Sequence, residues 1–190
     1  DILFIIGGSG NISGASLKIL KHFGESRVNV LYVCADPSLL TDIKYLQDRA
    51  TFHILQEYAR SGMISCLYLI SNKHIEDMIG GIPVKKYYNT INEYLVSSIH
   101  MTNIFKNTDA VINSIPEVSD ICRIATFGLL DIETNTENLF FPLDSSQEIS
   151  YIYGVNEERL REDGDLHTKI VSQMKGKVKG GGSLTALPII

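Results

Sequence analysis

The sequence predicts an α/β protein built on a parallel, Rossmann-like sheet. Two observations support this class: short apolar runs recur along the first part of the chain, and each is followed by a segment with apolar residues at helical spacing. Strands that are apolar throughout are typical of a parallel sheet covered by helices on both faces. The alternating strands and helices predicted for this part are 1–6, 14–23, 28–35, 38–61 and 63–70.

A long central helix is predicted next. The segment 82–107 carries Pro83 near its start, where the first turn of a helix tolerates proline, and its apolar residues fall on one side of a helix. We therefore predict one continuous helix over 83–107.

The rest of the chain predicts a smaller mixed α+β domain. Its predicted elements are a helix then a strand in 118–133, a loop in 134–148, a strand in 149–155, a helix over 156–178 interrupted near Gly164, and a final strand in 183–190. The expected parts of the whole chain are 1–82, 83–107 and 108–190.

Composition excludes several classes of partner. The chain has 190 residues, is 44% hydrophobic and carries a net charge of −5, and its longest basic run is Lys85–Lys86. A chain with a net negative charge and no cluster of basic residues offers no positively charged surface to nucleic acid or to an anionic membrane. No stretch approaches the roughly 20 apolar residues of a membrane span, so we expect no membrane insertion. The sequence also begins at Asp1 inside an apolar run without Met, and we expect residues upstream of it.

The three cysteines, Cys34, Cys66 and Cys122, lie far apart in apolar stretches. This spacing favours buried thiols in a reducing cytoplasm over a zinc cluster or a disulfide framework. No metal-binding set is predicted from the residues, and the expected location is the cytoplasm.

The opening segment, DILFIIGGSGNISGASLKIL, places glycines at 7, 8, 10 and 14 between a predicted strand and a predicted helix. Glycines in this position permit a tight turn, bring backbone N–H groups close to an anion and place a helix N-terminus behind it. The loop therefore predicts a phosphate site, with the alternative that the glycines only turn the chain.

A dinucleotide site is one interpretation of this loop. The spacing Gly8-x-Gly10-x-x-Ser13 matches the dinucleotide motif except for serine at the third glycine, and Asp36 follows the next strand, where a carboxylate could bond a ribose hydroxyl. Asp36 before Pro37 is equally typical of a cap or turn. Since no hydride-transfer motif follows, an NAD(P)-binding protein is kept as an alternative.

The run GGSGNISGAS also resembles the signature loop of the tubulin/FtsZ superfamily, particularly the phage and plasmid branch represented by PhuZ and TubZ. The matching residues are Gly7, Gly8, Ser9, Gly10 and Gly14, whereas the family's leading glycine is Ile6 here. The resemblance implies that Gly7, Gly8, Ser9 and Gly10 cradle phosphates.

Later residues extend the resemblance to guanine recognition. It implies that Asn72, after the third strand, and the pair Asn92 and Glu93, on the central helix, contact the base. An amide both donates and accepts, and a carboxylate can accept from two guanine donors together. The structural alternatives are a helix cap at Asn72 and a solvated helix face at Asn92 and Glu93.

The superfamily also has a co-catalytic loop that acts on the nucleotide of the next subunit. The resemblance implies that Glu117 and Asp120, in the spacing Glu-x-x-Asp, have this role, with glutamate replacing the first aspartate. The same residues would also satisfy a helix N-terminus, and the segment containing Asp109 is a rival placement of the loop.

The function implied is GTP-dependent, head-to-tail assembly into protofilaments, with hydrolysis completed across the subunit interface. GTP or GDP with Mg²⁺ would be the cofactors, and an adaptor or cargo protein would be a further partner. The chain would then supply the second half of a GTPase domain, the central helix and part of the activation domain. The alternative within the same fold is a structural or assembly protein that binds no nucleotide.

Overall fold

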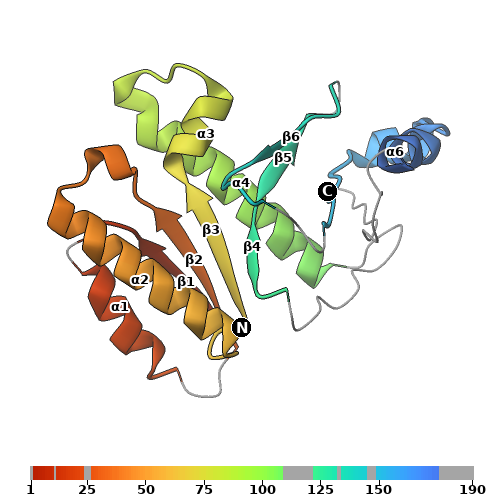
Figure 1. Ribbon diagram of the computed structural model, residues 1–190. Helices are drawn as coiled ribbons and strands as arrows, with labels where there is room; N and C mark the ends of the chain where they lie inside the picture. The colour runs from red at the N-terminus through yellow and green to blue at the C-terminus, as the bar shows by residue number, and fades with distance from the viewer. Residues whose placement is uncertain are drawn as a thin grey trace. The chain divides into compact units, whose positions relative to one another are not determined.

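A four-stranded parallel sheet is the centre of the first part of the structure (Figure 1). The structure is a computed structural model that describes residues 2–10, 12–23, 27–108, 122–131, 134–144 and 149–175. The chain divides into two units, one drawn from 1–91, 119–131 and 136–142, and the other from 92–118, 132–135 and 143–190. The sheet and the glycine loop belong to the first unit.

The sheet has the strand order β1-β2-β3-β4. Its strands are β1 (Ile2–Gly7), β2 (Val28–Cys34), β3 (Cys66–Ser71) and β4 (Ile124–Thr126), and each pairs in parallel with the next. The predicted α/β class and its first three strands are confirmed, although β3 begins three residues later than the predicted 63–70.

Two helices cover one face of this sheet, α1 (Ser13–Leu20) and α2 (Asp42–Arg60) (Figure 1). Their apolar sides pack on alternate residues of the strands, which follows from the two-residue period of a strand and the 3.6-residue period of a helix. The buried residues of this core are Ile6, Leu20, Val28, Val30, Tyr32, Leu55, Ala59, Ile64, Leu67 and Leu69. Helix α1 ends before the predicted 14–23 does, because the chain turns after Leu20.

The other face of the sheet is covered unevenly. Leu31 on β2 and Ile70 on β3 are fully buried, whereas Leu3 and Ile5 on β1 are 43% and 57% exposed. Within the described sheet, β1 pairs only with β2. The expectation of a sheet covered on both faces is therefore confirmed over the inner strands and wrong over β1.

Short 3-10 turns precede two of the helices. The turn η1 (Pro37–Leu39) comes before α2, and η2 (Val84–Lys86) comes before α4 (Tyr87–Asn107). The predicted helix starts at 38 and 83 were therefore too early. Leu40 is extended and separates η1 from α2, whereas Pro83 is extended just before η2, which continues into α4. A further helix, α3 (Asn72–Ile79), follows β3 directly.

A two-stranded antiparallel hairpin follows β4. It consists of β5 (Gly128–Leu130) and β6 (Glu137–Leu139). Of the helix and then strand predicted in 118–133, the strand is confirmed by β5, whereas the described residues before it form β4 and no helix. The predicted loop 134–148 contains β6. Strands of three residues are too short for a periodic signal, and their partners stabilise them instead.

The second unit contains helices α5 (Glu157–Glu162) and α6 (Leu166–Lys175), and their separation confirms the predicted interruption near Gly164. The predicted strand 149–155 is wrong, since only Tyr151 forms a bridge there. Its alternating aromatic residues include Tyr153, which is buried without a strand around it. The predicted strand 183–190 lies outside the described residues. Among the helices that the structure describes, none is long and apolar enough to span a membrane.

Candidate functional site at the carboxyl edge of the sheet

The carboxyl ends of β1, β2 and β3 bring three of the predicted site segments to one edge of the sheet (Figure 1). Gly7 lies opposite Val33 on β2, and Cys34 lies opposite Ser71 on β3. The glycine loop and Asn72 are therefore separated by two strand spacings, about 10 Å. Loops at this edge are the usual location of ligands in parallel α/β sheets.

The glycine loop has no room for a side chain at Gly8. A Cβ atom there would lie 2.6 Å from Asp48 Oδ1, 2.8 Å from the carbonyl oxygen of Val33 and 2.9 Å from the nitrogen of Ala35. The N–H of Gly8 donates to that same Val33 oxygen at 2.7 Å. Gly7 and Gly14 have open space where a Cβ would stand, so glycine is sterically required only at Gly8 of these three.

Ser9 has the left-handed backbone conformation, with φ of 62°. This conformation is unfavourable by about 1–2 kcal/mol for a residue with a side chain. The N–H of Ser9 donates to Asp48 Oδ1 at 3.2 Å, across 39 residues of sequence. The loop conformation is therefore held by a side chain of α2.

Asp48 is fixed in turn by Tyr32. The Tyr32 hydroxyl donates to Asp48 Oδ1 at 2.5 Å, and the Tyr32 side chain is only 1% exposed. Burial, together with the carboxylate beside it, raises the pKa of Tyr32 above its ordinary value. Burial, again with a contribution from Asp48, raises the pKa of Cys34 to about 12. Tyr32 and Cys34 thus stay protonated beside a carboxylate.

Ser13 replaces the third glycine of the dinucleotide motif, and it closes the loop. Its hydroxyl lies 2.7 Å from the carbonyl oxygen of Gly7 and 2.8 Å from that of Gly10, and it can donate its one proton to either. The residue is buried at the start of α1. The serine that departs from the dinucleotide motif therefore stabilises this turn.

Backbone donors also remain in the loop. No described residue accepts a hydrogen bond from the N–H of Gly10 or of Ile12. Both stand just before the N-terminus of α1, where the helix dipole favours an anion. The loop thus offers an anion these two donors, while the N–H groups of Gly8 and Ser9 already have acceptors.

Asp36 caps the turn after β2. Its Oδ1 accepts from the backbone N–H of Ser38 at 2.9 Å and from the Ser38 hydroxyl at 2.7 Å. These hydrogen bonds, with a smaller contribution from the Lys73 ammonium, lower the pKa of Asp36. The structure thus gives Asp36 the capping role that its position before Pro37 also predicted.

Asn72 is the first residue of α3, and the cap is Ser71. The Ser71 hydroxyl accepts from the N–H of His74 at 3.3 Å, and the Ser71 N–H donates to the carbonyl oxygen of Phe140 at 2.7 Å. Since Ser71 does the capping, the Asn72 side chain is not needed for it. Whether Asn72 contacts a base stays a prediction.

The remaining predicted site residues are not brought to this edge by the described contacts. Asn92 and Glu93 are exposed on α4 and belong to the second unit. Glu117, Asp120 and the rival Asp109 lie outside the described residues. Their roles therefore remain predictions.

Asp48 and Tyr32 were missed from the sequence, although each leaves a signal. Asp48 stands four residues before Phe52 and seven before Leu55, so a carboxylate occupies the apolar stripe of α2. Tyr32 puts a hydroxyl inside an apolar strand, where it needs a partner. A carboxylate on an apolar stripe and a tyrosine in a buried strand are the features that predict such a contact.

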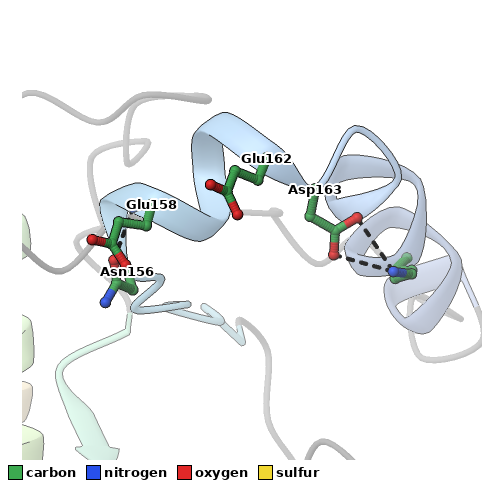
Figure 2. Close-up of a pocket in the computed structure, with 5 residues that line it drawn as sticks. Asn156, Glu158, Glu162 and Asp163 are labelled. Carbon is green, nitrogen blue, oxygen red and sulfur yellow. Dashed lines mark hydrogen bonds and ion pairs between the residues drawn. The ribbon is translucent and has the colours of Figure 1, made fainter.

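The second unit has a separate, acidic depression of about 640 Å³ (Figure 2). It is lined by Asn156, Glu158, Glu162, Asp163 and Lys169. Lys169 donates to both oxygens of Asp163, and Asn156 Oδ1 accepts from the N–H of Glu158. Within the described residues, no group of three or more His, Cys, Asp or Glu could hold a metal ion. We assign this depression no function.

Comparison with solved structures identifies the fold. The chain is similar to a crystal structure of GDP-form protofilaments of TubZ from Bacillus thuringiensis serovar israelensis, with a TM-score of 0.60 and 14% identity over 98% of this chain. It is also similar to a GTPγS-form protofilament of the same protein, with a TM-score of 0.57 and 15% identity over 97% of this chain. The chain therefore has a TubZ-like fold.

This tubulin/FtsZ-like fold is a partial one, because the chain spans 56% of the length of either TubZ chain. No protein-family model matches the sequence, and no curated protein matches it. The likeness therefore confirms the α/β fold of this kind, and membership of the tubulin/FtsZ superfamily stays a prediction. Membership of the phage and plasmid branch stays a prediction.

Proposed function

We propose that the chain belongs to a tubulin/FtsZ-like protein of the cytoplasm that binds guanine nucleotide and assembles head to tail into protofilaments. The observation that carries the proposal is the glycine loop after β1, placed in a fold that matches TubZ protofilaments in GDP and GTPγS forms. An adaptor or cargo protein is the further partner expected of such a filament.

The residues of the loop fit a phosphate chain in three respects. Gly8 lets the backbone pass where no side chain fits, Gly10 and Ile12 keep backbone donors available, and α1 begins directly behind them. Gly7, Gly8, Ser9 and Gly10 would form the cradle. A bound nucleotide would supply its own phosphates, and Mg²⁺ would neutralise part of their charge.

Guanine recognition is assigned to Asn72, Asn92 and Glu93. Asn72 supports this role because it leaves the same sheet edge as the glycine loop and Ser71 caps the helix in its place. Asn92 and Glu93 are exposed side chains on α4. Hydrolysis would be completed by Glu117 and Asp120 acting on the nucleotide of a neighbouring subunit, where a carboxylate would orient the attacking water.

Self-association is supported by exposed apolar residues beside the loop. Leu39, Ile43 and Leu46 are 82%, 70% and 64% exposed, and they follow β2 from the same sheet edge. Ile43 and Leu46 are three residues apart in α2 and so lie on one side of that helix, and Leu39 precedes them in η1. Apolar side chains gathered in this way are typical of a protein interface.

An assembly protein of the same fold that binds no nucleotide is the second candidate. The observation that favours it is the Asp48 carboxylate, which already holds the Ser9 N–H in the predicted cradle. The NAD(P)-binding alternative is disfavoured by strand order: β4 lies next to β3, whereas in the dinucleotide fold the fourth strand lies next to the first.

The test is an equilibrium titration with fluorescent GTP, with unlabelled GTP, ATP and NAD(P)H as competitors and light scattering followed in the same cuvette. The proposal predicts competition by GTP alone and a rise in scattering that depends on it. Displacement by NAD(P)H would favour the dinucleotide protein. Scattering that is independent of every nucleotide, with no binding, would favour the nucleotide-free assembly protein.

A matched pair of glycine variants locates the binding in the loop. Gly10→Val places a branched side chain within 3.0 Å of Ser13 Oγ, where the backbone must approach phosphate, and should abolish GTP binding. Gly14→Ala, on α1 with open space around it, should bind GTP as the unmodified chain does. Equal affinities in the two variants would remove the loop from the site.

A further inference from the structure

The contact between Asp48 and the glycine loop has a chemical consequence for any anion. Asp48 Oδ1 accepts from the Ser9 N–H at 3.2 Å and from the Tyr32 hydroxyl at 2.5 Å. A phosphate oxygen that bonds the same Ser9 N–H must approach within hydrogen-bond distance of that nitrogen. Two negatively charged oxygens would then meet at one donor.

Among the described residues, no ion pair neutralises the charge of Asp48. No basic side chain in the described part of the chain forms a salt bridge with it, and the basic residues of α2 for which contacts are given are engaged elsewhere. Arg49 lies over the ring of Tyr45, and Arg60 pairs with Glu57. Within the described residues, the hydrogen bonds to the Asp48 carboxylate come from the Tyr32 hydroxyl and the Ser9 N–H, and Lys44, four residues earlier on α2, forms no salt bridge with it.

We propose that Asp48 is a specificity-determining residue of the glycine loop, and that its carboxylate weakens binding in proportion to the negative charge of the ligand's phosphate chain. This inference rests on the proposed function, because it concerns the phosphates of a guanine nucleotide in that loop. Two unit charges about 4 Å apart repel by an energy equal to roughly a fivefold change in affinity in water, and by more near a protein surface.

Asp48→Asn is the variant that isolates the charge. The asparagine Oδ1 can still accept from the Ser9 N–H and the Tyr32 hydroxyl, so the loop keeps its support while the negative charge is removed. Glu57→Gln is the matched control: it removes the same charge from an exposed position about 13 Å further along α2. Thermal unfolding of the three proteins checks that each one folds.

The measurement is the affinity of each protein for GTP, GDP, GMP and guanosine, by displacement of fluorescent GTP, first in EDTA and then with Mg²⁺. In EDTA, Asp48→Asn should bind GTP roughly tenfold more tightly than the unmodified chain, GMP less than fivefold more tightly, and guanosine equally. Glu57→Gln should match the unmodified chain for all four ligands.

The other outcomes are distinct. If the unmodified chain binds GTP and Asp48→Asn binds all four ligands with the same affinities, the inference fails and the proposed function stands. If Asp48→Asn binds GTP more weakly than the unmodified chain when Mg²⁺ is present but not in EDTA, Asp48 is a ligand of the metal and the inference is overturned. Binding by Asp48→Asn where the unmodified chain shows none would support it, and no binding by either protein would end both proposals.

Discussion

Two turns leave the same edge of the sheet, and they are held in opposite ways. The loop after β1 is fixed by residues far away in sequence, since Asp48 accepts from the Ser9 N–H and Val33 accepts from the Gly8 N–H. The turn after β3 is fixed mainly by its neighbours, since Ser71 caps the His74 N–H and Lys73 pairs with Asp77 at 2.5 Å.

This difference teaches how much each turn depends on the rest of the fold. The glycine loop exists in this form only when β2 and α2 are in place, so its conformation and the tertiary structure should be lost together. The α3 turn has its cap and its ion pair within a few residues, besides the hydrogen bond from the Ser71 N–H to Phe140, and should respond mainly to local changes. Four measurements test this contrast.

The largest effect is expected from Gly8→Ala. The new Cβ would meet two backbone atoms and a carboxylate at 2.6–2.9 Å, so the strand end must shift and the free energy of unfolding should fall by about 3 kcal/mol. Urea unfolding measures this change in the free energy of unfolding. Gly14→Ala is the control, and it should leave stability unchanged or raise it slightly. Equal unfolding midpoints for Gly8→Ala and the unmodified chain would show that the loop is not tightly packed.

Alkaline pH should destabilise the first unit. Burial raises the pKa of Cys34 from 9.0 to about 12, so the thiol stays protonated in the folded chain where it ionises in the unfolded one. The stability it contributes is complete below pH 9 and declines as the pH rises toward 12, with a loss of roughly 2 kcal/mol by pH 11.

Cys34→Ala should remove the part of this decline that begins near pH 9. The part above pH 10 should remain, because the pKa of Tyr32 is raised as well and an unfolded tyrosine ionises from about pH 10. Denaturant unfolding from pH 8 to 11 makes the comparison. An unchanged slope in Cys34→Ala would mean that the thiol is free to ionise in the folded chain.

Tyr32→Phe should have a smaller effect that reaches the loop. It removes the hydroxyl that holds Asp48, which should lower the free energy of unfolding by roughly 1–2 kcal/mol and speed hydrogen exchange at the Ser9 amide. Tyr88→Phe, at a side chain 70% exposed, should change neither quantity. If exchange at Ser9 is unaltered in Tyr32→Phe, Asp48 holds the loop without help from β2.

The smallest effect is expected from Ser71→Ala. Loss of the cap should lower stability by about 1 kcal/mol and speed exchange at the His74 amide, with the Ser9 amide unchanged. Ser71→Asp keeps an acceptor at the cap and should restore both values. A change at Ser9 in Ser71→Ala would contradict the independence of the two turns.

The same contrast explains what the sequence could predict. Strands β1, β2 and β3 follow from periods that are visible within a few residues of the chain, and the predicted cap at Asn72 was one residue from the observed cap, Ser71. The glycine loop was located correctly, but its support by Asp48 and Tyr32 joins three elements, and no local pattern shows which side chain reaches which backbone group. The hairpin of β5 and β6 was missed for the same reason, since each strand depends on its partner.

The exposed side of β1 matters for the handling of the protein. Its outer backbone groups pair with no described strand, its Leu3 and Ile5 side chains face outward, and the strand carries no charged residue. Such an edge is open to strand addition by another molecule, which is how soluble proteins begin to aggregate. Turbidity from this edge would grow with concentration and time whether or not nucleotide is present. Light scattering by the chain should therefore be recorded over time in nucleotide-free buffer first. Only a rise above that baseline can then be attributed to polymer.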